Sequence, residues 1–241
     1  MSTFDPKLGL ILNTRPAVYH GRFHEAFGDL PWAIYDCPLT HEEPISAVFP
    51  PPGAHDSLIF TSQIAVNLFF VDPPWRLKTV YAVGEATAKA AVRAGYARVI
   101  QTGENVDDLR QHLANDSFAS ALYPSATEVS ADLAQEFLGR ITRVPIYRMI
   151  ARDGLPDQFA KMAARMHVVA PVFSRRNAVI LADLMSKAGL TQKNSAVFAV
   201  GMSKDVFEGV QGAWQRQPIA KAPTMQGIVA MTRATIEALG P

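Results

Sequence analysis

The sequence predicts an α/β protein of two similar domains, each with a parallel sheet flanked by helices, and a cleft between the domains. Apolar runs with strand character alternate along the 241 residues with segments of helical character. Such alternation is typical of parallel sheets that helices cover on both faces.

An internal repeat indicates that this architecture is built twice. The run VYAVG that ends at Gly84 is nearly copied by VFAVG, which ends at Gly201. Two further pairs share one common separation along the chain: Tyr35 with Tyr147, and Ser62 with Ser174. A repeat of this length is too long for a solenoid and indicates two similar domains.

The chain begins with a strand, a helix and a second strand. The apolar run at residues 8–13 predicts a strand, and residues 16–30 predict a helix that Thr14 can cap. A proline in the first turn suits the start of that helix. A short strand follows at residues 33–35, and the many prolines of residues 41–55 predict mostly loop.

The same order continues through the middle of the chain. Residues 57–60 predict a strand, after which Thr61 and Ser62 can cap a helix that ends at Pro73-Pro74. Next come a strand at 79–83, a helix at 86–94 with Gly95 in the terminating position, a strand at 99–100 and a helix capped by Asn105.

The pattern then restarts, and its hydrophobic periodicity assigns the second half. Strands are predicted at 121–123, 144–150, 167–173 and 196–200, and helices at 128–138, 156–166 and from Ser174 to 189. A weak helix broken by Gly209 and Gly212 precedes a last helix, which runs from Thr224 to about residue 239.

Composition argues against several classes of protein. The chain has 23 basic and 22 acidic residues, whereas broad nucleic-acid binding needs a large positive excess. No apolar stretch approaches the length of a membrane span. The amino terminus lacks the features of a secretion signal, and the single cysteine, Cys37, excludes an internal disulfide. We expect a cytoplasmic protein that binds neither nucleic acid nor membrane.

The six histidines form no recognisable metal-binding motif. His20 and His24 are spaced to share one helix face, but no third ligand is evident in the sequence. We expect surface or packing roles for these side chains and no bound metal.

Hydroxyl side chains stand where strands are expected to become helices. Thr61, Ser62 and Ser174 lie at such joints, where backbone N–H groups and the helix dipole suit a carboxylate. In open α/β sheets, ligands bind beyond the carboxyl ends of the strands, where these joints fall. Plain helix capping is the alternative use of the same side chains.

The two repeated glycines are further candidates for a binding site. Gly84 and Gly201 can allow a tight turn or a close approach of the backbone to a ligand. Thr87 and Ser203 follow them closely and can add hydroxyl contacts. A simple strand-to-helix turn is the alternative for the glycines.

Five basic residues lie near the same joints or near the crossover: Arg15, Arg148, Arg175, Arg176 and Lys204. Arg15, Arg148 and Arg175 can each bind a carboxylate through paired hydrogen bonds. The first two are the preferred candidates. The alternative for each one is a solvated surface charge.

Taken in order, these motifs resemble those of the uroporphyrinogen-III synthase family. The resemblance is carried by Asn13–Pro16, Ile59–Val66, Val80–Ala88, Gly103-x-Asn105, Ile146–Arg148 and Pro223-Thr224, and it spans nearly the whole chain. It implies two α/β domains, residues 1–36 with 149–241 and residues 38–147, which two adjacent crossing segments join.

The resemblance also implies an activity. The family acts on hydroxymethylbilane, a linear tetrapyrrole polycarboxylate, which it closes to uroporphyrinogen III with loss of water and inversion of ring D. It needs no metal or organic cofactor and is expected to act as a monomer. Tyr147 matches the family's strand tyrosine, whose protonated phenol can hydrogen-bond the departing hydroxyl. A structural tyrosine packed in the hinge is the alternative.

Two stretches depart from the family's usual pattern. They are Arg175-Arg176 and Met202-Ser203-Lys204. These departures leave open a non-catalytic, synthase-like protein that binds a tetrapyrrole or another small anion. Without the resemblance, a hinged two-domain protein that binds a small molecule is a third hypothesis.

Overall fold

The computed structural model divides into two compact units. Unit 1 comprises Met1–His41 and Ala151–Pro241, and unit 2 comprises Glu42–Ile150. The structure describes residues 9–69, 73–116, 118–129, 131–190, 193, 195–210 and 213–240. The amino-terminal segment considered for a secretion signal, Leu8 of the first predicted strand, and Gly212 lie outside the described residues.

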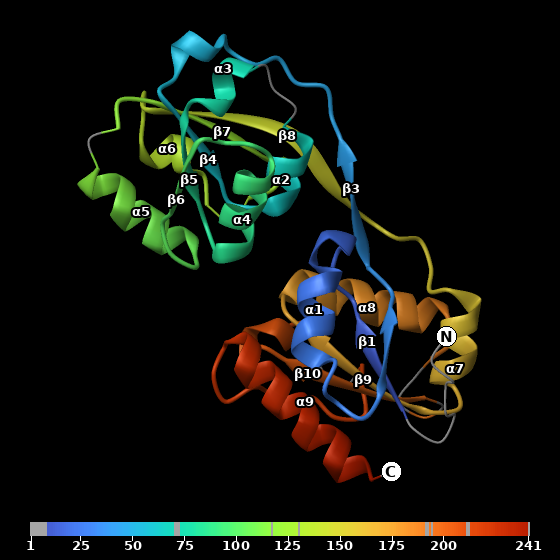
Figure 1. The fold of residues 1–241 in the computed structure, drawn as a ribbon. Coiled ribbons are helices and arrows are strands. Elements are labelled where there is room, and N and C mark those ends of the chain that lie inside the picture. Colours follow the sequence, from blue (N-terminus) through green and yellow to red (C-terminus); the bar gives the residue numbers. More distant parts are fainter. Residues whose placement is uncertain are drawn as a thin grey trace. The chain divides into compact units, whose positions relative to one another are not determined.

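Unit 1 contains a four-stranded sheet with the order β10-β9-β1-β2 (Figure 1). All three neighbouring pairs are parallel. The strands are β1 (Leu10–Asn13), β2 (Ala33–Asp36), β9 (His167–Val172) and β10 (Ala196–Gly201). Because the strands run in one direction, their carboxyl ends lie at one edge of the sheet.

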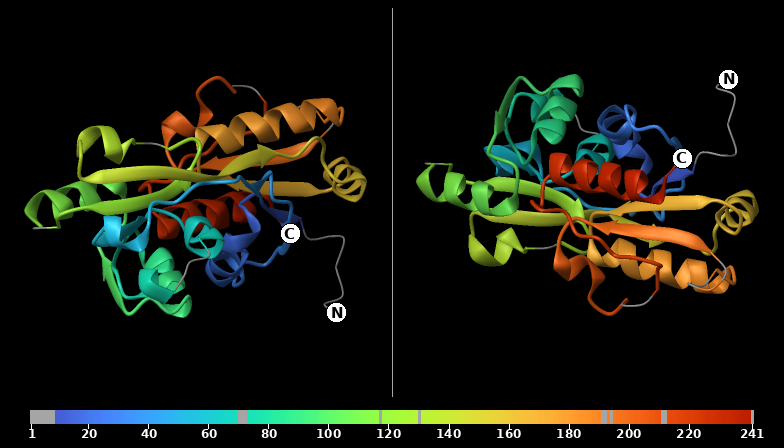
Figure 2. Two further views of the ribbon diagram at one scale, coloured as in Figure 1. Left: turned by 90° about the horizontal axis from the view of Figure 1, so that it is seen from above. Right: turned by 90° about the horizontal axis from the view of Figure 1, so that it is seen from below.

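Helices cover both faces of this sheet, as the sequence predicts. Leu10 and Leu12 pack into one core with side chains of α7 (Asp157–Ala163) and α8 (Arg175–Lys187). Ile11, which points to the other face, packs with side chains of α1 (His20–Phe27) and α9 (Met225–Leu239). Figure 2 shows α8 and α9 on opposite sides of the strands. β1 is therefore buried on both faces.

Unit 2 is built around a six-stranded sheet with the order β3-β8-β7-β4-β5-β6. The neighbouring pairs from β8 to β6 are parallel. The strands are β3 (Thr40–Pro44), β4 (Ser57–Phe60), β5 (Thr79–Ala82), β6 (Arg98–Gln101), β7 (Ala121–Ala126) and β8 (Ile141–Ala151).

Helices also lie on both faces of the unit 2 sheet. One core joins Ile59 and Tyr81 to side chains of α5 (Val106–Asn115) and α6 (Leu133–Glu136). On the other face, Phe60 packs its ring against Phe69 and Tyr96, next to α2 (Gln63–Leu68), α3 (Pro73–Arg76) and α4 (Glu85–Arg93). The predicted class, parallel sheets flanked by helices, is confirmed.

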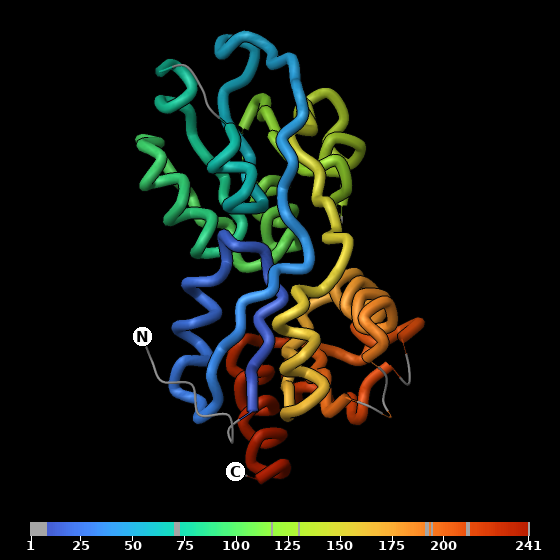
Figure 3. Tube along the Cα trace, turned by 90° about the vertical axis from the view of Figure 1, so that its right-hand side faces the viewer, coloured from blue at the N-terminus to red at the C-terminus, as the bar shows by residue number. Residues whose placement is uncertain are grey.

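The chain passes between the units in two neighbouring strands. The first passage, at residues 41 and 42, lies in β3, and the return, at residues 150 and 151, lies in β8. These two strands are neighbours in one sheet, and Figure 3 shows them running side by side.

Several predicted helix caps are confirmed. The hydroxyls of Ser62, Ser174 and Thr224 each accept a hydrogen bond from a backbone N–H in the first turn of the helix that follows. Asn105 caps α5 and forms a capping box with Asp108. Local residue types therefore locate these helix starts correctly.

Other predicted elements are wrong in extent or kind. The segment 41–55, predicted as mostly loop, has no regular structure at residues 45–51 but contains most of β3. An edge strand tolerates a proline at its end, and Ile45 N–H still bonds Ile146 C=O at 3.0 Å. Pro73-Pro74 begins the short α3 instead of merely ending α2, which suits proline in a first helical turn. The predicted helix 128–138 is reduced to α6, and residues 17–19 form a separate 3-10 turn before α1.

The short limit of α6 has a local cause. Asp132 caps it at one end by accepting a hydrogen bond from Ala134 N–H. Gly139 adopts a φ of 75° just beyond the other end. A left-handed glycine terminates a helix readily, so the segment between these two residues can hold only about one turn.

Cys37 lies directly after β2 and is buried. Its N–H donates to Asn13 C=O at 2.8 Å, and its Sγ accepts from Arg152 Nη1 at 3.0 Å. Burial raises the pKa of the thiol.

In the part of the chain that the structure describes, no helix is long and apolar enough to cross a membrane.

Substituting Gly201 is expected to destabilise the protein. A Cβ at this position would lie 2.6 Å from Phe207 Cε2, so Gly201→Ala forces the ring to shift. Overpacking of this kind lowers the free energy of unfolding by about 1–3 kcal/mol, which denaturant titration measures. Gly154→Ala is the control, because open space surrounds that glycine. Equal midpoints for the two variants would contradict the packing argument.

Candidate active site

In unit 2, a tyrosine and a serine meet at the carboxyl end of β4. Tyr147 Oη, on β8, donates a hydrogen bond to Ser62 Oγ at 3.2 Å. Ser62 Oγ also accepts from Ile64 N–H at 3.0 Å, so the hydroxyl that caps α2 receives the phenol as well. These two residues, far apart in the chain, are brought together as a pair.

A bulge between β7 and β8 aims Tyr147 at this place. Ser125 pairs with Pro145, but Ala126 pairs with Tyr147, so one extra residue is inserted in β8. A bulge shifts the alternation of side chains and re-aims the residue that follows it. Tyr147 is only 4% exposed, and its C=O accepts from Thr127 N–H at 2.8 Å. The phenol is therefore held in a fixed orientation.

A second phenol lies beside the first pair. Tyr123, on β7, shares a hydrogen bond of 3.1 Å with Thr61 Oγ1. Burial raises the pKa of Tyr123, so its hydroxyl stays protonated at neutral pH. Sequence reasoning placed Tyr123 in a strand but missed it as a neighbour of the site, because only the register of β7 against β4 shows the contact.

The predicted turn at Gly84 is confirmed. Gly84 adopts a φ of 77° before α4, and its N–H donates to Gly103 C=O at 2.7 Å. Thr87 is buried in the first turn of α4.

Arg148 is paired with an acid on the neighbouring strand. Its Nη2 and Nε donate to the two carboxylate oxygens of Glu43 at 2.8 and 3.3 Å. The pKa of the Arg148 guanidinium is raised by this pair. Both side chains are about half exposed. Because Glu43 already pairs with the guanidinium, a ligand carboxylate that bound Arg148 would have to replace it. Arg148 follows Tyr147 directly, and adjacent strand residues point to opposite faces.

In unit 1, Arg15 is held against two aromatic rings. Its guanidinium carbon lies 4.6 Å from the ring centroid of Tyr19 and 4.7 Å from that of Phe173. The side chain is half-buried, and burial lowers the pKa of the guanidinium. Among the described residues, no carboxylate forms an ion pair with Arg15. The residue after Phe173 is Ser174, so two predicted site residues come close through the sheet.

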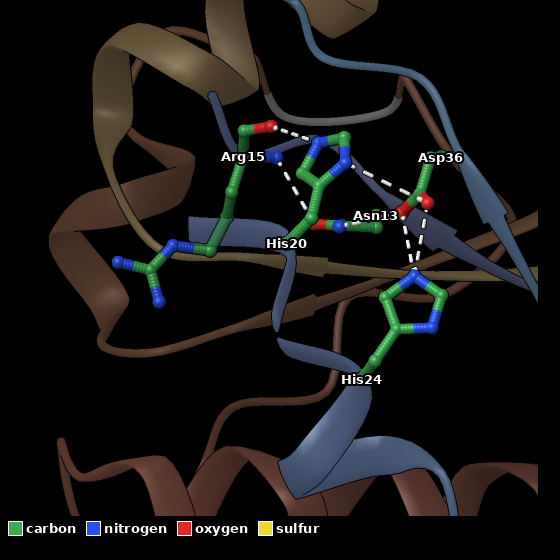
Figure 4. Close-up of polar contacts among 5 residues, drawn as sticks. All are labelled: Asn13, Arg15, His20, His24 and Asp36. Atoms are coloured by element: carbon green, nitrogen blue, oxygen red, sulfur yellow. Dashed lines mark hydrogen bonds and ion pairs between the residues drawn. The ribbon is translucent and has the colours of Figure 1, made fainter. Parts of the chain in front are cut away.

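A polar network lies next to Arg15 (Figure 4). Asp36 accepts a hydrogen bond from Asn13 Nδ2 at 2.7 Å, and its two carboxylate oxygens lie 2.9 and 3.1 Å from His24 Nε2. Asp36 also lies 3.6 Å from His20 Nδ1. The predicted sharing of one helix face by the two histidines is confirmed. Sequence reasoning missed Asp36, because only the packing of α1 against the end of β2 brings its carboxylate to the two histidines.

Asp36, His20 and His24 do not form a group that could hold a metal ion. The described residues contain no group of three or more histidine, cysteine, aspartate or glutamate side chains that could hold a metal ion.

The remaining candidates of unit 1 lie at or just after the ends of the paired strands β9 and β10. Arg175 forms an exposed ion pair of 3.1 Å with Glu208. Gly201 lies within β10 and packs against Phe207, unlike its counterpart in unit 2. Ser203 precedes a 3-10 turn and makes no side-chain cap there.

A family model described as uroporphyrinogen-III synthase HemD matches residues 22–230. The chain belongs to the uroporphyrinogen-III synthase family. Members of this family are cyclising lyases of haem biosynthesis. The resemblance inferred from the motifs is therefore confirmed.

One solved uroporphyrinogen-III synthetase shares the fold. The structure is similar to uroporphyrinogen-III synthetase from Helicobacter pylori, with 17% identity, a TM-score of 0.63, and coverage of 95% of this chain and 99% of that one. A mutant and the wild-type uroporphyrinogen III synthase from Thermus thermophilus match at 12% and 13% identity, with TM-scores of 0.44 and 0.37. Each of these two matches covers 96% of this chain and 98% of the Thermus chain. No curated protein sequence matches the chain.

The Asp36 carboxyl of this synthase-family chain is expected to have a pKa below the ordinary value for aspartate. Burial alone would raise its pKa, but the hydrogen bonds from Asn13 and His24, together with the charge of the histidines, bring the pKa below its ordinary value. Stabilisation by these contacts is therefore present above the ordinary pKa of aspartate and is lost as the pH falls through the lowered value. NMR titration of the carboxyl carbon measures this pKa.

Asn13→Ala supplies the control for that titration. It removes one of the hydrogen bonds to the carboxylate, so the Asp36 pKa is expected to rise in this variant. An Asp36 pKa at or above the ordinary value in the unaltered chain would contradict the network.

Proposed function

We propose that this chain closes hydroxymethylbilane to uroporphyrinogen III, with loss of water and inversion of ring D. The observation that carries the proposal is the family match across residues 22–230, supported by the shared fold. The comparisons give no support to the alternative of a non-catalytic tetrapyrrole-binding protein.

In the proposed mechanism, Tyr147 assists the departure of the hydroxyl group. Its protonated phenol donates to Ser62 in the ligand-free chain and can transfer that hydrogen bond to the substrate hydroxyl. The C–O bond then breaks, and the hydroxyl takes the phenol proton and leaves as water. The pyrrole N–H gives up its proton to restore the phenol, which leaves a reactive azafulvene. Ser62, which accepts the phenol's hydrogen bond, holds the donor ready for this exchange.

Positioning accounts for the rest of the reaction. The azafulvene cyclises by itself to the wrong isomer, so the protein must hold the folded bilane with the substituted carbon of ring D near the reactive carbon. Fixing two groups of one molecule in this way is catalysis by proximity. We assign this task to polar groups at the carboxyl ends of the strands, where ligands bind in open α/β sheets.

The proposed contacts differ in how directly the site geometry supports them. Arg15, Thr61 and Ser62 present polar groups at strand ends, and Ser174 caps a helix of 13 residues at a similar joint. Arg148 and Arg175 would exchange their present acidic partners for substrate carboxylates. We propose the backbone of Gly84 and the hydroxyls of Thr87 and Ser203 as minor contacts, and a packing role for Gly201.

We also propose how the chain is organised in the cell. Units 1 and 2 are proposed to be the two domains of the protein, with boundaries at residues 41–42 and 150–151 instead of near 37 and 148. The chain is proposed to act as a cytoplasmic monomer on a small-molecule substrate, without nucleic acid, membrane or cofactor.

The isomer composition of the product tests this function. Freshly generated hydroxymethylbilane is supplied to the protein, and the uroporphyrinogen isomers are separated. We expect isomer III to form in excess over isomer I. Isomer I alone, formed at the rate seen without protein, would exclude the synthase.

Removing the phenol hydroxyl tests the role of Tyr147. Tyr147→Phe loses one neutral hydrogen bond worth about 1 kcal/mol, so isomer III formation is expected to fall about fivefold, with the fold unchanged by circular dichroism. The matched control is Tyr96→Phe in the same unit. The Tyr96 hydroxyl is buried without a hydrogen-bond partner among the described residues, so its removal should leave the rate unchanged. An unaltered rate in Tyr147→Phe would remove this residue from the mechanism.

A further inference from the structure

We propose that Asp36, Asn13 and His20 are positioning residues, which hold Arg15 as a preformed receptor for one carboxylate of the substrate. This inference rests on the proposed function, because it assigns a role in the same reaction. It concerns groups of unit 1 alone, and it goes beyond the choice of Arg15 as a contact by saying what holds that side chain ready.

Both backbone polar groups of Arg15 are bound by side chains of the network. Its N–H donates to Asn13 Oδ1 at 3.2 Å, and its C=O lies 3.0 Å from His20 Nε2. A carbonyl can only accept, so His20 Nε2 must carry the proton in this contact. Figure 4 shows the two contacts on either side of the Arg15 backbone. The backbone of Arg15 is therefore held in place at both its N–H and its C=O group.

Asp36 sets the orientation of both groups that hold Arg15. An ionised carboxylate only accepts hydrogen bonds, so the Asn13 NH₂ group faces it at 2.7 Å, and the amide oxygen is left to face the Arg15 N–H. On the other side, Asp36 Oδ2 lies 3.6 Å from His20 Nδ1. When the imidazole carries protons on both nitrogens, the carboxylate attracts Nδ1 while Nε2 donates to the Arg15 carbonyl. His24 occupies both oxygens of the same carboxylate and steadies it.

The Arg15 side chain leaves this network, and its charge has no acidic partner among the residues that the structure describes. Figure 4 shows the guanidinium directed away from Asp36. The rings of Tyr19 and Phe173 hold the guanidinium by cation–π contact, with 4.6 and 4.7 Å from its carbon to their centroids. Within the described parts of the chain, no carboxylate pairs with it. Its N–H donors suit the two oxygens of a ligand carboxylate.

The position of Arg15 fits a ligand contact. Arg15 follows β1 and Phe173 follows β9, and these strands are parallel neighbours. The cation thus lies at the carboxyl edge of the unit 1 sheet, where ligands bind in open α/β proteins. A receptor group that is fixed in advance loses less conformational freedom when the ligand binds, and this increases affinity. Asp36 therefore acts on the substrate only through Arg15.

A double-mutant cycle on the full chain tests this coupling. Arg15→Gln, Asp36→Asn and the double variant are compared for KM and kcat of isomer III formation from fresh hydroxymethylbilane. Arg15→Gln removes a charge-assisted contact, so KM should rise about tenfold. Asp36→Asn should raise KM about threefold with little change in kcat, and the double variant should be no worse than Arg15→Gln alone.

Asp183→Asn is the matched control for Asp36→Asn. It makes the same change of charge in unit 1, at an exposed ion pair with Lys187 in α8. KM should stay at the wild-type value in this control. An unchanged KM in Asp36→Asn, or single effects that multiply in the double variant, would overturn the proposal.

A second comparison keeps the test decisive if Asp36→Asn does not fold. His20→Gln retains an N–H group that can reach the Arg15 carbonyl, whereas His20→Ala does not. We expect KM to rise in His20→Ala and to return close to the wild-type value in His20→Gln, and equal values for both would overturn the proposal. Absence of isomer III from the unaltered chain would instead contradict the proposed function.

Discussion

The burial of parallel strands on both faces is the constraint on which the rest of the structure depends. In β1, the side chains of Leu10, Ile11 and Leu12 are all at most 1% exposed. In β4, Leu58, Ile59 and Phe60 are fully buried. Each such side chain contributes about 1.5–3 kcal/mol through removal from water.

This burial leaves polar groups few places to go. A polar side chain in the middle of such a strand would lose its hydrogen bonds to water without replacement. Several polar candidates therefore follow the strands, such as Arg15 after β1 and Thr61 and Ser62 after β4. Tyr147 and Tyr123 lie within strands, where their hydroxyls form hydrogen bonds with Ser62 and Thr61. Asn13, which is fully buried at the end of β1, is tolerated because Asp36 and Arg15 satisfy its amide.

Much of this arrangement can be predicted from local sequence, and the limits of prediction are physical. Ser174 and Thr224 locate α8 and α9 well, because capping depends on residues within one turn. The strand character of residues 41–44 depends instead on pairing with β8 across about a hundred positions. The contact of Tyr123 with Thr61 also joins residues far apart in the chain, and that of Asp36 with α1 spans more than a helical turn, so no short-range pattern contains either contact.

The repeat shows how sequence similarity can hide a structural difference. VYAVG and VFAVG both form buried strands, but the backbone at Gly84 has a positive φ and opens α4, whereas Gly201 remains in β10 against Phe207. The path of the chain after each strand therefore depends on the residues that follow the glycine, and not on the shared pentapeptide. The similar strands of the two units are thus followed by different backbone at their carboxyl ends.

The only cysteine of the chain provides a chemical reporter of motion in unit 1. Cys37 is buried, and its Sγ accepts a hydrogen bond from Arg152 Nη1. Burial raises the pKa of its thiol. A thiol reacts as the thiolate and only when a reagent can reach it. Alkylation of Cys37 therefore requires the chain after β2 to open. Its labelling rate in the native state reports the free energy of that local opening, next to the network that holds Arg15, without any engineered probe.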